Sequence, residues 1–73
     1  MNTKAPAQVA ARLKALRVGA GLTQETLAKA AGIDRKTINR IENGHFSPHL
    51  DTFFRICYAL NVRPVDIVGG IKV

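Results

Sequence analysis

The sequence "TQETLAKAAGIDRKTINRIENG", residues 23–44, contains two short helical segments separated by a break. The side-chain oxygen of Thr23 is placed to cap a helix over residues 24–31, "QETLAKAA". Gly32 ends this helix at a point where the chain needs a positive φ angle. Asp34 is placed to cap a second helix over residues 35–42, which ends before Gly44. The stretch therefore predicts two helices of similar length, joined by a tight turn.

The second of these helices has few residues for a protein core. Only Ile38 and Ile41 are strongly apolar, whereas Arg35, Lys36 and Arg40 place basic side chains on the remaining surface. Two short helices joined by a glycine-containing turn predict a helix-turn-helix, in which the second helix enters the major groove of DNA. The broad basic face of residues 35–42 is therefore expected to contact a molecule outside the protein.

The rest of the chain also has helical spacing of its apolar residues. Val9, Leu13 and Leu16 predict a helix over 7–18, and a stripe from Leu50 to Leu60 predicts one over about 49–60, begun by Ser47 and Pro48. A last turn over 63–68, "RPVDIV", precedes two glycines that are expected to end the ordered part. The predicted fold is all-α, a compact five-helix bundle. It forms one domain over 1–73, with a flexible arm at 1–6 and a short tail at 69–73.

Length and composition limit the classes of function. A chain of 73 residues, of which 47% are hydrophobic, can form one core but rarely an enclosed catalytic pocket as well. No nucleophile and base stand at a sensible spacing, so an enzyme is not expected. His45 and His49 are separated by Pro48 and have no further ligand cluster, so no metal and no cofactor are expected. Cys57 is the single cysteine and lies on an apolar stripe, which predicts a core residue in a cytoplasmic protein.

The charge of the chain indicates a polyanionic partner. Eleven Lys and Arg stand against five Asp and Glu, which gives a net charge of +6 and a sequence pI near 10.3. A charge of this size on a small domain attracts nucleic acid first and anionic membranes second. No apolar run approaches the roughly 18–20 residues that span a bilayer. Double-stranded DNA is therefore the expected partner.

At this point the sequence resembles a known family. "LTQETLAKAAGIDRKTINRIENG", residues 22–44, is similar to the Xre/Cro family of bacterial and phage repressors, and the similarity continues through "SPHLDTFFRICYALNV", residues 47–62. In total it covers about residues 9–68. The resemblance implies the fold of the lambda repressor-like DNA-binding domain and a function in transcription regulation.

The resemblance also implies roles for individual residues. Base reading is implied for Arg35, Lys36, Thr37, Asn39 and Arg40. Phosphate binding is implied for Gln24 and Asn43, for the backbone amides of Gly44 and His45, and as a second role for the capping residue Thr23. Arg17 and Glu42 match a pair that forms an internal salt bridge in the family. Because arginine and lysine prefer O6 and N7 of guanine, the target half-site should contain at least one G.

A homodimer is expected, because one recognition helix covers too few base pairs for tight specific binding. The candidate interface residues lie past the second helix of the motif: Phe46, Phe54, Tyr58, Arg63, Pro64 and Val68. For Phe54 and Tyr58 a place in the core is an equally open alternative.

The expected function is a homodimeric repressor that binds a pseudo-palindromic operator. A restriction-modification controller and an antitoxin with a toxin as partner share the DNA-binding step. A protein–protein adaptor that does not bind DNA is the remote alternative, and it predicts a neutral or acidic helix at 35–42.

Overall fold

The computed structural model describes residues 4–45 and 48–70, which contain five helices and no strand. The five helices are α1 (Lys4–Gly19), α2 (Gln24–Ala31), α3 (Arg35–Glu42), α4 (Leu50–Leu60) and α5 (Pro64–Val68). The prediction of an all-α bundle is confirmed. Within the described ranges, no helix is both long enough and apolar enough to cross a membrane.

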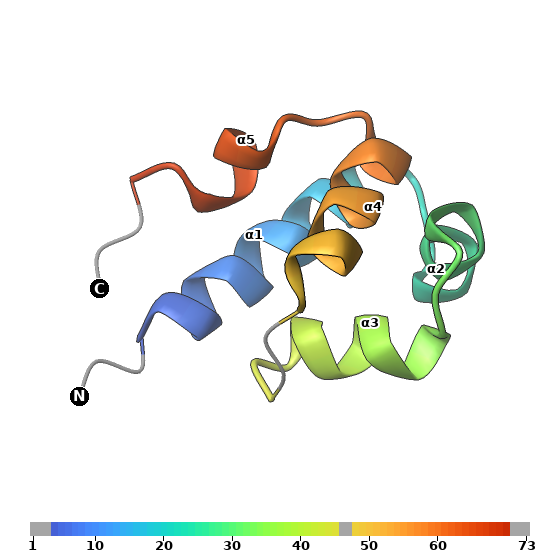
Figure 1. The fold of residues 1–73 in the computed structure, drawn as a ribbon, viewed down its shortest axis with the longest axis horizontal. Coiled ribbons are helices and arrows are strands. Elements are labelled where there is room, and N and C mark those ends of the chain that lie inside the picture. The colour runs from blue at the N-terminus through green and yellow to red at the C-terminus, as the bar shows by residue number, and fades with distance from the viewer. Residues whose placement is uncertain (1–3, 46–47, 71–73) are drawn as a thin grey trace.

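The helices surround one hydrophobic core. Figure 1 shows α1 running through the molecule, with α3 below it, α5 above it, and α2 at the side opposite the chain ends. α3 packs on α2 and α1, and α4 packs on α2 and α5. The largest fully buried side chains come from four of the five helices: Leu27, Ile38, Ile41, Ile56 and Ile67. Leu13 of α1 is also buried, so every helix contributes to the core.

The first helix begins earlier than its apolar spacing predicts. α1 starts at Lys4 instead of residue 7, and Pro6 lies in its first turn. Proline is compatible with this position because the first N–H groups of a helix have no acceptor within the helix. α1 thus includes residues 4–6 of the predicted arm, residues 1–3 lie outside the described part, and the flexibility of the arm stays a prediction.

The turn between α2 and α3 has the predicted geometry. Thr23 caps α2: its Oγ1 accepts a hydrogen bond from the Thr26 amide at 3.0 Å, and its own amide donates to Thr26 Oγ1 at 2.8 Å. Gly32 adopts the left-handed conformation, with φ 70° and ψ 34°, which only glycine reaches at little cost. Ala28 is 3% exposed, as a small residue packed inside the motif should be.

Two other helix starts differ from the prediction. Asp34 holds the backbone position of a cap for α3, but its side chain makes no capping hydrogen bond. The Thr37 amide, a usual donor to a cap, instead donates to the Asp34 carbonyl at 3.0 Å. α4 begins at Leu50, after Pro48 and His49, and Leu50 is 67% exposed. Because side chains tilt toward the N-terminus of their helix, Leu50 extends past the edge of the core.

The end of α5 is tied to α1. The Arg12 guanidinium donates to the carbonyl of Ile67 at 3.2 Å and to the carbonyl of Gly69. The Gly69 amide donates to the Val65 carbonyl at 2.7 Å, and a Cβ at Gly69 would lie only 2.6 Å from that carbonyl oxygen. The Gly69 backbone is therefore held by α1 and α5, and the short tail expected over 69–73 stays a prediction. Residues 71–73 lie outside the described part.

Candidate nucleic-acid interface

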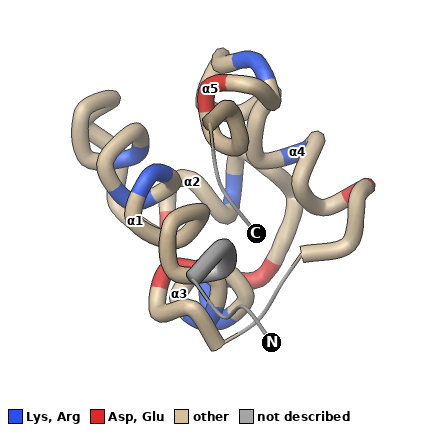
Figure 2. Tube along the Cα trace, turned by 90° about the vertical axis from the view of Figure 1, so that its left-hand side faces the viewer, with Lys and Arg blue, Asp and Glu red and all other residues tan. Residues whose placement is uncertain are grey.

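α3 presents a basic surface and is anchored along its opposite edge. Arg35, Lys36 and Arg40 are exposed, whereas Ile38 and Ile41 are at most 1% exposed. Figure 2 marks the basic positions on α3 and on α1. The basic side chains and the buried isoleucines alternate at helical spacing, so the core holds α3 without using its basic face.

A buried ion pair joins α3 to α1 on the side of α3 that faces the rest of the protein. Arg17 Nε lies 2.6 Å from Glu42 Oε2, and Arg17 NH2 donates to Glu42 Oε1 at 3.0 Å. The two side chains are only 10% and 2% exposed. The hydrogen bond that Arg17 donates to Glu42 raises the pKa of Arg17 above its usual value, although burial acts in the opposite direction. Arg17 therefore has the structural role that the family resemblance implies, and its charge is not available to DNA.

A chain of hydrogen bonds extends from this pair toward the surface. Gln24 Nε2 donates to Glu42 Oε1 at 3.1 Å, and Asn39 Nδ2 donates to Gln24 Oε1 at 3.2 Å. Asn43 Nδ2 then donates to Asn39 Oδ1 at 3.1 Å. The exposure increases along this chain, from the buried Glu42 side chain to the exposed Asn43. The family resemblance implies DNA contacts for Gln24, Asn39 and Asn43, but no pattern in the sequence indicates that these three side chains contact one another.

The turn after α3 revises one predicted role. The Gly44 amide donates to the Ile41 carbonyl at 3.0 Å, and the His45 amide donates to the Arg40 carbonyl at 2.9 Å. Both amides that were expected to hold phosphate are thus used to end α3. The exposed side chains of Asn43 and His45 remain as polar groups of this turn that can approach a phosphate.

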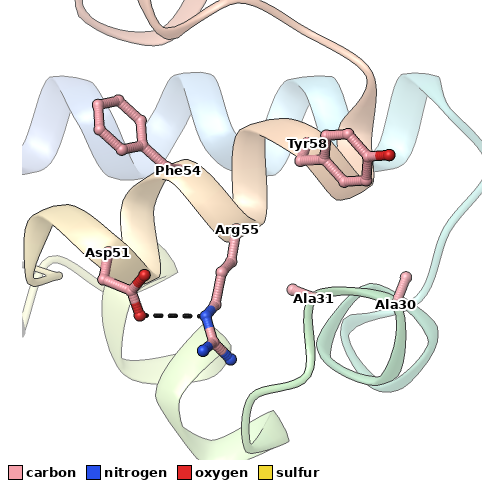
Figure 3. Close-up of a pocket in the computed structure, with 6 residues that line it drawn as sticks. All are labelled: Ala30, Ala31, Asp51, Phe54, Arg55 and Tyr58. Atoms are coloured by element: carbon pink, nitrogen blue, oxygen red, sulfur yellow. Dashed lines mark ion pairs between the residues drawn. The ribbon is translucent and has the colours of Figure 1, made fainter.

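The predicted interface residues fall into two groups. Phe54 and Tyr58 project from α4 and are 49% and 90% exposed, so the alternative that places them in the core is wrong. As Figure 3 shows, they line a shallow groove beside the end of α2, together with Ala30, Ala31 and the ion-paired Asp51 and Arg55.

The second group lies on α5 and the residue before it. Arg63, Pro64 and Val68 are exposed there. Val65 is 51% exposed and extends this surface, although the sequence analysis does not single it out. Its spacing of three residues from Val68 is the signal that could have identified it. Phe46 lies outside the described residues.

Cys57 is a core residue, as predicted. It lies on α4, its side chain is part of the hydrophobic core, and the residue is 3% exposed. Burial raises the pKa of its thiol, and the negative charge of Asp66 acts in the same direction. A buried, protonated thiol is a poor nucleophile, so the cysteine has a packing role.

The fold and the basic outer helix define a helix-turn-helix protein, and comparison with known proteins agrees. The model of the helix-turn-helix family HTH_3 matches residues 13–67. The chain therefore belongs to this family, as the resemblance to Xre/Cro repressors predicts.

Individual relatives come from several backgrounds. An uncharacterised HTH-type transcriptional regulator of Archaeoglobus fulgidus is 38% identical over 56 residues, which are 77% of this chain and 80% of that protein. Antitoxin PezA of Streptococcus pneumoniae is 42% identical over 82% of this chain, which spans only 38% of the antitoxin. The crystal structure of the restriction-modification controller protein C.AhdI from Aeromonas hydrophila superposes with a TM-score of 0.83 at 32% identity, over 85% of this chain and 94% of that one.

Proposed function

We propose that this protein is a cytoplasmic transcriptional repressor that binds operator DNA as a homodimer, with α3 in the major groove. The observation that carries the proposal is the division of α3 into two sides. Arg35, Lys36 and Arg40 face outward, while the Arg17–Glu42 pair and two buried isoleucines hold the helix from behind. A rigidly held helix with exposed basic side chains matches the requirements of major-groove recognition.

Base reading is assigned to the outer residues of α3. Arg35, Lys36 and Arg40 carry donors that match O6 and N7 of guanine, and the half-buried Thr37 lies among them. Phosphate contacts are assigned to Thr23 and Gln24 at the start of α2 and to the side chains of Asn43 and His45 in the turn after α3, whereas the Gly44 amide donates to the Ile41 carbonyl. Because phosphate carries no base identity, these residues set affinity and orientation, and the outer residues of α3 set specificity.

The dimer is proposed to form through the α4–α5 end of the molecule. Tyr58, Val65 and Val68 expose apolar surface there, away from the basic side of α3. Exposed apolar surface of this kind marks contact sites in small proteins. A two-fold axis through this end would place two recognition helices about one DNA turn apart, roughly 34 Å. Phe46, Phe54, Arg63 and Pro64 complete the proposed contact.

Two neighbouring functions share the same DNA-binding step. The match to C.AhdI over nearly the whole of that chain favours a controller of a restriction-modification system as a second candidate. The similarity to antitoxin PezA favours an antitoxin, with a toxin bound at the α4–α5 end. Expression of the adjacent gene with and without this protein separates these cases, since only an antitoxin relieves the toxicity of its neighbour.

A salt titration of DNA binding tests the proposed function. A dimer that presents several basic side chains to phosphate on each subunit should lose affinity steeply as salt increases. The expected slope of log affinity against log salt is roughly −5 or steeper. Affinity for duplex DNA that does not change with salt would contradict the electrostatic part of the proposal.

A further inference from the structure

The hydrogen-bond chain between Glu42 and Asn43 has a direction that chemistry alone determines. An ionised carboxylate only accepts hydrogen bonds. Glu42 Oε1, which already accepts from Arg17, must therefore meet the NH2 end of Gln24, at 3.1 Å. The oxygen of Gln24 is then turned toward α3, where it can only accept. Hence Asn39 must direct its own NH2 group toward Gln24, at 3.2 Å.

The same reasoning continues to the surface. With its nitrogen turned to Gln24, Asn39 offers its oxygen to Asn43, whose NH2 group donates to it at 3.1 Å. Each link permits one orientation, and the orientation of the last amide follows from the first carboxylate. The buried Arg17–Glu42 pair fixes that carboxylate, so a rigid buried group orients the exposed amide of Asn43 at the end of α3.

The fixed direction of the hydrogen bonds determines which donors Gln24 and Asn43 present to a ligand. An amide NH2 group has two N–H donors. The hydrogen-bond chain uses one of the two from each of Gln24, Asn39 and Asn43. Among the described residues, the second N–H donors of Gln24, at the start of α2, and of Asn43, at the end of α3, have no acceptor and are left for a ligand. Two donors on neighbouring elements match a ligand that only accepts, such as a phosphate oxygen.

From this geometry we infer that Asn39 is a positioning residue, which orients Gln24 and Asn43 toward a DNA phosphate, and not a reader of bases. This inference rests on the proposed function. It departs from the role that the family resemblance implies for Asn39. Both ends of the Asn39 amide are engaged within the protein, and the side chain is half-buried.

Phosphate scanning with Asn39→Ala tests the inference. Operators are prepared in which single phosphates are replaced by uncharged methylphosphonates, and binding is measured for wild type and variant. For wild type, the substitution at the phosphate bound by Gln24 and Asn43 should weaken binding about ten-fold, as expected for one charge-assisted hydrogen bond. Asn39→Ala should bind the unmodified operator about ten-fold more weakly. It should lose most of the methylphosphonate penalty and keep the base preferences of wild type.

Matched controls make the outcomes distinct. Alanine has the highest helix propensity, so Asn39→Ala should retain α3, and a melting curve verifies this. Lys36→Ala, on the same helix but outside the hydrogen-bond chain, should keep the full methylphosphonate penalty at that phosphate. A changed preference at one base pair with an unchanged methylphosphonate penalty would show that Asn39 reads a base, and would overturn the inference. Wild type that binds no DNA would instead overturn the proposed function and the inference with it.

Discussion

The α3 side and the α4–α5 end of this protein are both exposed, but they are built differently. On the α3 side the exposed groups are polar, and hydrogen bonds connect them to an ion pair that is 10% and 2% exposed. At the other end apolar side chains are exposed beside ion pairs: Tyr58 is 90% exposed and Val65 is 51% exposed. Reading DNA depends on directed donors, which must be held in place. Association through apolar surfaces depends mainly on the area that is buried, so the side chains at such a contact need less precise orientation.

The largest expected effect concerns the support behind α3. Glu42→Ala removes the carboxylate that compensates the buried Arg17 charge and leaves only its hydrogen bond to the Leu22 carbonyl, which should lower the free energy of unfolding by about 3–5 kcal/mol. Thermal or urea denaturation measures the loss. Asp51→Ala is the matched control, since it removes the Asp51–Arg55 pair, whose side chains are 79% and 52% exposed. Exposed pairs contribute about 0–1 kcal/mol, so equal losses in the two variants would show that the Arg17–Glu42 pair is not the main support.

The second prediction separates reading from holding on the α3 side. Arg40→Ala should weaken operator binding by about 1–3 kcal/mol and relax the preference at one base pair in each half-site. Gln24→Ala should weaken binding to all sequences by a similar factor, because its proposed ligand is a phosphate. Binding measured against a panel of single-base operator variants distinguishes the two. A uniform loss in Arg40→Ala would remove Arg40 from the base-reading set.

The third prediction concerns the apolar end. Val68→Asp places a charge in the proposed dimer contact and should weaken dimerisation at least ten-fold, or about 1.4 kcal/mol. Sedimentation velocity over a range of concentrations measures the effect. Val18→Asp, at a 59% exposed valine on α1, makes the same substitution outside the proposed contact and should leave the dimer intact. Equal dimerisation in the two variants would place the interface elsewhere.

The smallest expected effect tests how α5 is held. Arg12→Met removes the donor to the carbonyls of Ile67 and Gly69. The loss of these hydrogen bonds should lower stability by about 1 kcal/mol and weaken dimerisation by a few-fold through α5. Lys14→Met removes an equal charge from an exposed position of the same helix and serves as the control. A loss of stability without any loss of dimerisation would mean that α5 lies outside the contact.

The contrast between the two ends also explains how far the sequence could predict the structure. Thr23, Gly32 and the buried Ile38 and Ile41 follow local rules of capping, left-handed turns and helical spacing, and the structure agrees with all of them. The contact of Arg12 with the end of α5 joins residues 55 and 57 positions apart in the chain, and no local pattern announces it.

The candidate site shows the same limit. The sequence identifies Gln24, Asn39 and Asn43 as polar residues near the motif, and the Arg17–Glu42 pair is implied only by resemblance. Their connection into one chain depends on how α2 and α3 cross, which is a tertiary property. Leu50 begins the apolar stripe that predicts α4 but is 67% exposed, and this difference has a similar origin. Spacing identifies the face of a helix, but the extent of the core determines how many turns of that face are covered.

Selection of bound sites from random duplex DNA tests most directly whether α3 is a recognition helix presented twice by a dimer. The selected sequences are expected to form a pseudo-palindrome, with half-sites centred about one helical turn apart and at least one guanine in each. Repeating the selection with Arg40→Ala should blur one position of each half-site and leave the spacing unchanged. Recovery of no preferred sequence by wild type, or of a single half-site bound by a monomer with full affinity, would contradict this view of the protein.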